Sequence, residues 1–220
     1  MNSWNWDGTR YLFDKPIRFG DSSDYVEIDA AGELSLGGDA TVWEDLQVAI
    51  NNIKLPTSSA PGYEYYAFGI GGGVSYPVLA FALDEYIYFD VQTSHSMKLN
   101  TILDCHIHFT LPNTTNIGDK FKFQLDVIAA GIDTQWAVPA SSPFTAEHTI
   151  VANDDTYHRL LEIADIDSSN DTVSTIYKCK LTRVDASSDE YGSDVYVLFI
   201  DCHYEKDTMG SQVEGAKVAP

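Results

Sequence analysis

The chain has 220 residues and a mass of 24.4 kDa, enough for one large all-β domain with a buried core. Its 13 basic and 33 acidic side chains give a formal net charge of −20 at pH 7, which would repel a nucleic-acid backbone or an anionic membrane surface. No apolar run approaches the roughly 20 residues that a membrane-spanning helix needs. We therefore expect neither nucleic acid nor membrane among its partners.

The opening stretch, MNSWNWDGTRYLF, has neither the basic patch nor the apolar run of a secretory signal, so synthesis in a cytoplasm is expected. Three cysteines, an odd number, do not make a disulfide framework. Cys105, Cys179 and Cys202 each fall where a small buried hydrophobe belongs. All three are expected to be unbridged thiols.

Residues 1–41 predict an extended N-terminal arm. The segment YVEIDAAGELSLGG, with a turn at Ala31-Gly32, indicates a β-hairpin within it. Five large apolar side chains gather near its start: Trp4, Trp6, Tyr11, Phe13 and Phe19. These are too many for a solvated arm, so we expect them to form an interface with a neighbouring protein.

Residues 42–206 predict a single β-sandwich domain. Apolar and polar residues alternate in most segments, and FKFQLDV is typical, with Phe121, Phe123, Leu125 and Val127 on one face. Turn signals at regular intervals favour a jelly-roll-like sandwich over a repeat protein. The sequence thus predicts an all-β fold.

Three segments are less regular. TYHRLLEIAD is compatible with a short helix or with an edge strand. Residues 58–77 mix glycine with aromatic residues and predict the longest loop. Residues 207–220 have no periodicity and predict a C-terminal tail that is ordered only if something holds it.

The stretch ILDCHIHFTL, residues 102–111, raises the question of a metal site. On a strand Cys105 points to the core face, whereas His106 and His108 share the opposite face, so Cys105 and His106 cannot chelate together. The last strand repeats the pattern, because His203 lies opposite an apolar face formed by Tyr196, Leu198, Ile200, Cys202 and Tyr204. His106, His108 and His203 could share one metal ion if the two strands are neighbours, with Asp201 or Glu205 supplying carboxylates.

The cupin metalloenzymes are the obvious comparison for an H-x-H strand. Their pattern needs a glutamate four or five residues after the second histidine, where this chain has Pro112 and Asn113. The motif's opening glycine is also missing, since Asn100 stands there. We therefore expect a polar strand face, with no catalytic residues, no cofactor and no catalytic metal, although a cupin-like enzyme remains an alternative.

Exposed aromatic residues offer a different role. A sugar platform could be built from Trp136, Tyr63, Tyr65 or Tyr66, against the alternative that these residues pack in the core or in an interface. The paired carboxylates of so acidic a chain carry no comparable information, because they occur throughout it.

Three longer segments resemble a group of virion structural proteins of tailed bacteriophages. They are EIDAAGELSLGGDATVWEDLQV, the HIHF strand after YIYFDVQTSHSMK, and LFIDCHYEKDTMGS near the end, so the match spans about residues 25–211. The closing motif, Asp201 to Ser211, is the most specific. The chain differs from that group in having Phe109 where a Trp-type aromatic follows the H-x-H, and in lacking a collagen-like or fibre extension.

The resemblance implies a non-enzymatic structural protein on the surface of the virion, synthesised in the host cytoplasm. The compact chain favours a capsid decoration, or cement, protein that forms a homotrimer and contacts the major capsid protein. The alternative within the same group is a head-fibre or tail-fibre adhesin that binds host surface glycans.

Overall fold

The computed structural model describes residues 4–6, 11–13, 15–29, 32–48, 53–68, 73–137, 142–168 and 172–211, and for the first two ranges it describes only the backbone. Every regular element in these ranges is a β-strand except one three-residue 3-10 helix, η1 (Gly38–Ala40). The predicted all-β fold class is therefore confirmed. In the same ranges no helix has the length and apolar character that a membrane crossing requires.

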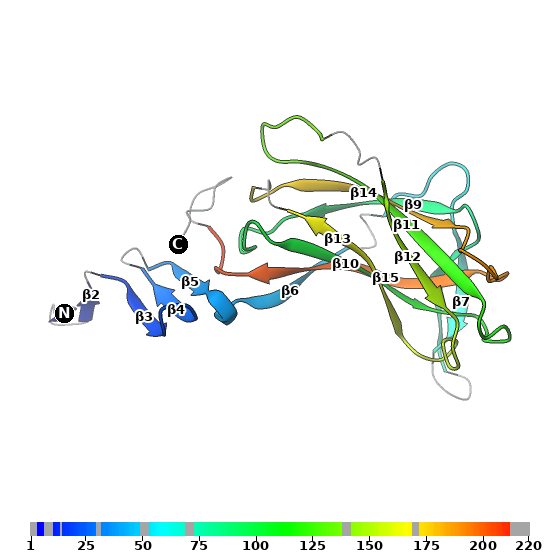
Figure 1. Cartoon of the computed structure of the whole chain (residues 1–220), viewed down its shortest axis with the longest axis horizontal. Coiled ribbons are helices and arrows are strands. Elements are labelled where there is room, and N and C mark those ends of the chain that lie inside the picture. The colour runs from blue at the N-terminus through cyan, green and yellow to red at the C-terminus, as the bar shows by residue number, and fades with distance from the viewer. Residues whose placement is uncertain are drawn as a thin grey trace.

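Two antiparallel sheets pack face to face to form the body of the molecule (Figure 1). The larger sheet has the order β13-β10-β15-β8-β7, with β6 paired to the second half of β15, and the smaller sheet has the order β12-β11-β14-β9. Their strands are β6 (Val42–Gln47), β7 (Gly62–Ala67), β8 (Ser75–Phe81), β9 (Tyr86–Gln92), β10 (Ile102–Thr110), β11 (Lys120–Ala130), β12 (Phe144–Thr149), β13 (Arg159–Asp167), β14 (Ile176–Val184) and β15 (Val195–Lys206).

The strand order is that of a jelly roll. When β8 to β15 are lettered B to I along the chain, the two sheets read B-I-D-G and C-H-E-F, the order that two Greek keys produce. Neighbouring strands are therefore distant in sequence, and β10 lies between β13 and β15. The jelly-roll-like sandwich predicted from the alternating pattern is confirmed.

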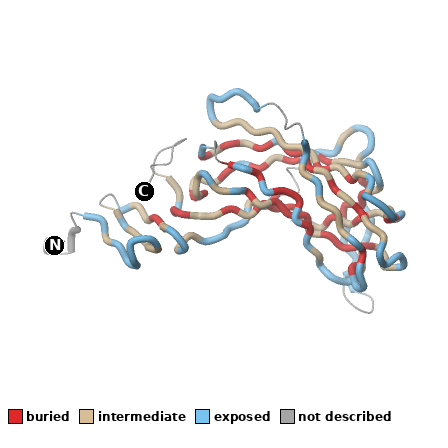
Figure 2. The backbone as a smooth tube through the Cα atoms, in the orientation of Figure 1, coloured by how far each residue is buried: buried red, intermediate tan, exposed pale blue. Residues whose placement is uncertain are grey.

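Alternate side chains from both sheets fill the space between them. On β11, Phe121, Phe123 and Leu125 are at most 1% exposed, as predicted. The ring of Phe123 meets that of Phe81 from the larger sheet at a centroid distance of 5.4 Å, and Phe121 meets Phe109 at 5.0 Å, both edge to face. Packing of this kind joins the two sheets into one core, which Figure 2 shows as a concentration of buried residues within the sandwich.

The arm forms a separate three-stranded sheet that extends away from the sandwich (Figure 1). Its strands are β3 (Ile17–Gly20), β4 (Tyr25–Ile28) and β5 (Leu34–Gly37), and the predicted hairpin is the β4–β5 pair. Gly20 has φ +124°, and an added Cβ would lie 2.2 Å from the backbone oxygen of Asp24, so the β3–β4 turn needs glycine. Nearer the N-terminus, β1 (Trp4–Trp6) pairs with β2 (Tyr11–Phe13).

The beginning of the predicted tail is held by the arm. Ser35 and Thr208 form an antiparallel bridge, and the backbone N–H of Leu36 donates to the carbonyl oxygen of Asp207. Asp207 and Thr208 are accordingly buried. The remainder of the predicted tail, residues 212–220, lies outside the described residues.

Two irregular segments are strands. Residues 58–77, predicted as a loop, contain β7 and the start of β8, which pair as a hairpin, so that prediction is wrong. Pro77 is tolerated in β8 because the ladder between β8 and β15 covers only Leu79 to Phe81. The segment for which a helix and an edge strand both remained possible, residues 156–165, forms most of β13, an edge strand of the larger sheet.

The central part of β15 differs from the predicted alternation. The sequence pattern places Tyr196 and Leu198 on the core face, but the structure buries Val195 and Val197 there instead, at 0% and 4% exposure. Leu198 has no partner in the ladder with β10, because the register shifts at this point. This part of the prediction is wrong because a β-bulge interrupts the alternation and exchanges the two faces.

A disulfide joins Cys105 to Cys202, which corrects the expectation of three unbridged thiols. The two residues lie directly opposite each other on β10 and β15, with Cα atoms 4.0 Å apart. Cys179 on β14 is a buried free thiol, as predicted. Burial of all three cysteines followed from the alternating pattern, but the pairing depends on which strands are neighbours.

Candidate functional site

A cluster of histidines and aspartates lies on the face of the larger sheet opposite the core, where β10 and β15 run side by side. The ladder pairs His106 with Asp201 and Asp104 with His203. Because residues two apart on a strand share a face, all four side chains project from the same side of the sheet. The sequence analysis required these two strands to be neighbours for the histidines to share one metal ion, and they are neighbours.

Asp201 lies at the centre of this cluster. Its Oδ1 is 3.2 Å from Nε2 of His108 and 3.7 Å from Nδ1 of His106, and its Oδ2 is 3.8 Å from Nε2 of His203. Asp201 is 4% exposed, and among the described residues it pairs with no lysine or arginine. In the described part of the chain, the ion-pair partners of this buried carboxylate are therefore imidazole rings.

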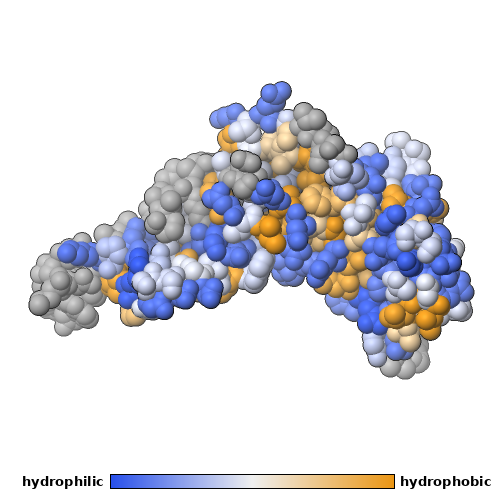
Figure 3. Space-filling model, in the orientation of Figure 1, coloured by the Kyte–Doolittle hydropathy of each residue, from blue (hydrophilic) through white to orange (hydrophobic). Residues whose placement is uncertain are grey.

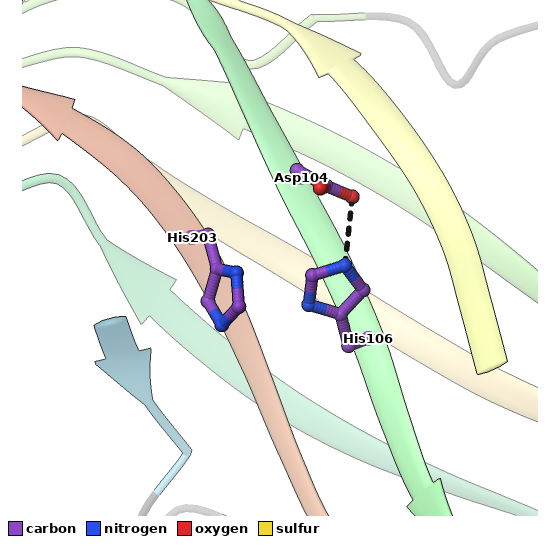
Figure 4. A group of neighbouring side chains, drawn as sticks. All are labelled: Asp104, His106 and His203. Atoms are coloured by element: carbon purple, nitrogen blue, oxygen red, sulfur yellow. Dashed lines mark ion pairs between the residues drawn. The ribbon is translucent and has the colours of Figure 1, made fainter. Parts of the chain in front are cut away.

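His106 is the most buried histidine of the cluster, at 3% exposure. Its Nε2 is 3.1 Å from Oδ1 of Asp104, and its ring lies edge to face with that of His203 at a centroid distance of 4.3 Å (Figure 4). Its Nδ1 is buried and has no hydrogen-bond partner. The two rings and the Asp104 carboxylate thus converge on one small region between the strands.

His203 also has a carboxylate from a third strand. Its Nε2 is 3.1 Å from Oδ1 of Asp45 on β6. Two overlapping groups have potential ligand atoms within 4.8 Å of one another: Asp104, His106 and His203 in one, and Asp45, Asp201 and His203 in the other. Asp45 was not identified from the sequence, because nothing in that segment shows that β6 pairs with the end of β15.

The remaining predicted ligands, His108 and Glu205, belong to neither of these two groups. Nδ1 of His108 is 2.6 Å from Nε2 of His158, a residue before β13 that the sequence analysis did not identify. Glu205 is instead 2.6 Å from Nζ of Lys98. Of the set considered from the sequence, His106, His203 and Asp201 belong to these groups, His108 contacts the cluster only through Asp201, and Glu205 lies outside it.

In a cupin, the glutamate ligand would stand at Pro112 or Asn113, and neither residue belongs to the histidine cluster. Pro112 lines a cavity with Tyr65, Tyr66 and Tyr196, and Asn113 accepts a hydrogen bond from the hydroxyl of Tyr191. The carboxylates near His106 are instead Asp104, from its own strand, and Asp201, from β15.

An apolar cavity of about 440 Å³ lies where β7, β8 and β15 meet. Tyr63, Phe68 and Tyr76 line it together with aliphatic residues of β8 and β15. Tyr63 is 57% exposed and Tyr76 is 56% exposed, so both rings are accessible. Figure 3 shows that hydrophobic residues also reach the surface over the sandwich in the view drawn.

The other aromatic candidates are arranged differently. Tyr65 and Tyr66 line the second cavity, of about 360 Å³, and the Tyr66 hydroxyl donates to the backbone carbonyl of Asp155. Trp136 lies after β11 and lines neither of these cavities. The four residues considered as a sugar platform therefore do not form one surface.

The predicted interface residues lie mostly where side chains are not described. Only the backbone is described for Trp4, Trp6, Tyr11 and Phe13. The side chain of Phe19, on β3, is 64% exposed.

No protein-family model and no curated protein sequence matches this chain. Among solved structures, a chain from the infectious bursal disease virus Gx strain aligns with 94% of this chain at 14% identity and a TM-score of 0.34. This chain spans 40% of the length of that viral chain.

Two further structures are carbohydrate-binding modules. One, from a study of promiscuous specificity in modules of the β-sandwich superfamily, aligns with 90% of this chain and 83% of its own length, at 10% identity and a TM-score of 0.30. The other, TmCBM61 in complex with β-1,4-galactotriose, aligns with 75% of this chain and 88% of its own length, at 11% identity and a TM-score of 0.23. These low TM-scores assign no function to the chain.

Proposed function

We propose that this chain is a non-enzymatic structural protein of a bacteriophage virion, a capsid decoration protein that attaches to the head shell through its N-terminal arm. The observation that carries this proposal is that the arm sheet, β3 to β5, has no core of its own. Within the described part of residues 15–41, Ser35 is the sole buried residue. Figure 2 accordingly draws the arm mainly in the colours of intermediate and exposed residues. A three-stranded sheet without a packed hydrophobic face has little independent stability.

Large apolar side chains are exposed on β3 and at the start of β6. Phe19 is 64% exposed, Val42 51% and Trp43 56%. A protein partner that covers the arm would bury these side chains, and contacts of this kind are how exposed apolar groups contribute to an interface. The sequence resemblance supplies the kind of partner: further copies of this chain, in a homotrimer, and the major capsid protein. Jelly-roll subunits with arms commonly assemble in this way, which is an inference by fold analogy.

Two other properties support a place on the particle surface. The net charge of −20 would help to keep decorated particles apart in solution. The Cys105–Cys202 disulfide suits a protein that is synthesised in the host cytoplasm but acts after release, because disulfides persist in oxidising surroundings.

Deletion of residues 2–19 tests the role of the arm. We expect the truncated protein to lose attachment to heads that lack the decoration protein while its sandwich stays folded, as judged by far-UV circular dichroism. Phe19→Asp in the full chain should weaken attachment in the same assay. The matched control, Tyr157→Asp, changes a residue that is 53% exposed on the sandwich and should leave attachment unchanged.

A glycan-binding adhesin is the second candidate, and the accessible rings of Tyr63 and Tyr76 at the apolar cavity favour it. Stacking on sugars is a common use of exposed aromatic rings. Under this alternative, Tyr63→Ala with Tyr76→Ala reduces phage adsorption to the host. If the truncated protein still occupies heads fully while adsorption fails, the adhesin replaces the decoration protein as the proposed function.

A further inference from the structure

We propose that Asp104, His106 and His203 form a binding site for one divalent transition-metal ion of the zinc class, which ties β10 to β15 on the face opposite the disulfide. The three side chains come from the two central strands of the larger sheet, and their potential ligand atoms lie within 4.8 Å of one another (Figure 4). The proposal goes beyond the structural role proposed above and does not depend on it.

The spacing of the atoms fits a shared ion. Nε2 of His106 and Oδ1 of Asp104 are 3.1 Å apart. Two ligands bound about 2.0–2.1 Å from a tetrahedral zinc ion lie about 3.3 Å from each other, so this pair needs little movement to bind one ion. His203 brings its ring within 4.3 Å of that of His106 and can complete the triad through Nδ1, since its Nε2 faces Asp45.

The outer nitrogens of both rings face carboxylates. His106 Nδ1 points toward Asp201 Oδ1 at 3.7 Å, and His203 Nε2 lies 3.1 Å from Asp45 Oδ1. A histidine that binds a metal through one nitrogen usually donates the other N–H to a carboxylate or carbonyl group. The cluster therefore contains the carboxylates that would orient each imidazole as well as the three ligands.

Burial and charge make a bound cation favourable here. His106 Nδ1 is buried without a hydrogen-bond partner, and small movements of the ring on binding an ion would bring it to Asp201. Among the described residues, Asp104, Asp201 and Asp45 pair with histidines and with no lysine or arginine. A cation bound here would therefore offset the negative charge of these three carboxylates, and imidazole nitrogens favour zinc over magnesium or calcium.

The test uses the untagged, full-length protein, stripped with a chelator and titrated with Zn²⁺ alone by calorimetry, with Mg²⁺ as the comparison ion. We expect one Zn²⁺ per chain, no comparable binding of Mg²⁺, and a melting temperature that rises with Zn²⁺. Co²⁺ in place of Zn²⁺ should give the visible absorption of a four-coordinate site with nitrogen ligands.

Asp104→Asn and His203→Gln should each abolish stoichiometric Zn²⁺ binding, and Asp45→Asn should weaken it by about tenfold as an orienting partner. The matched control is His158→Gln, which removes a histidine paired with His108 outside the triad and should leave binding unchanged. Asp104 and His203 both contact the buried His106, so far-UV circular dichroism must show that each variant is folded. Binding that is absent in the wild type, or that is equally strong in the folded Asp104→Asn and His203→Gln variants, would overturn the proposal.

Discussion

Cys105 and Cys202 face each other across the central strand pair of the larger sheet and are joined by a disulfide, with their Cα atoms 4.0 Å apart. The bond lies on the core side of β10 and β15, and both residues are at most 1% exposed. The two cysteines are 97 residues apart in the sequence, so the bond closes a long loop. Without it, the ends of this loop could move independently in the unfolded chain. Cross-links of long segments restrict the unfolded chain most strongly.

The first prediction is a count of thiols. Protein that is denatured without a reductant should titrate one thiol, from Cys179, and three after reduction. The double variant Cys105→Ser/Cys202→Ser should be less stable by about 2–5 kcal/mol in chemical denaturation. Three thiols in the unreduced protein, purified without reductant, would show that the bond does not form.

The second prediction concerns the reactivity of Cys179. Burial raises the pKa of its thiol to about 12, and the nearby negative charge of Asp90 adds to the shift. Because only the thiolate reacts, alkylation of the native protein at pH 8 should be negligible. After denaturation the same treatment should modify Cys179 alone. Rapid alkylation of the native state, detected by mass spectrometry, would contradict its burial.

The alternation of apolar and polar residues predicts which side chains of each strand face the core. It does not predict which strands pair with each other in the sheets. Phe121 and Phe123 could be assigned to the core because every second residue of a strand faces the same side. The bulge at Leu198 could not be predicted, because one unpaired residue has no characteristic sequence pattern. Its effect is that residues before and after it reverse which of them face the core.

The alternation of side chains along each strand also predicted part of the histidine and aspartate cluster. His106 and His108 could be placed on one face of a strand, and Asp201 and His203 on one face of another. That these strands are neighbours depends on the jelly-roll connectivity, which brings together segments far apart in the chain. Neither the Cys105–Cys202 bond nor the contact of Asp45 with His203 has a local sequence signal.

The third prediction concerns Asp154, whose side chain is fully buried. Its carboxylate accepts hydrogen bonds from Nε of Arg159 at 2.7 Å and from the backbone N–H of Val151 at 2.9 Å, and it lies 2.8 Å from Nε2 of His148. Asp154→Ala leaves these partners unsatisfied and should lower the free energy of unfolding by about 2–4 kcal/mol. This is somewhat less than for a fully buried ion pair, because Arg159 is partly exposed.

Urea denaturation of the Asp154→Ala variant provides the measurement, with a lower midpoint at an unchanged slope. Glu64→Ala is the matched control, because Glu64 is exposed on β7, and it should change stability by no more than about 0.5 kcal/mol. Equal effects of the two substitutions would show that the Asp154 contacts contribute nothing specific.

The fourth prediction follows from Glu147 on β12. The backbone N–H of Ser187 is the largest influence on this carboxyl group, followed by the Lys120 ammonium group at 3.0 Å and the Ser187 hydroxyl at 2.8 Å, and together they lower its pKa from 4.5 to about 2. The folded protein therefore binds this proton more weakly than the unfolded chain does. The stability that these contacts contribute is complete above pH about 4.5 and is lost as the pH falls toward about 2.

Melting temperatures of the wild type and of Glu147→Gln, measured across this range, should reveal the effect. The wild type should be the more stable at pH 6, and the difference should shrink between pH about 4.5 and about 2. Added salt should reduce the part that comes from Lys120, because the pair lies near the surface. Glu64→Gln, at an exposed position, should show no such trend. A difference for Glu147→Gln that stays constant down to pH 2 would mean that Ser187 and Lys120 do not hold Glu147 as a carboxylate.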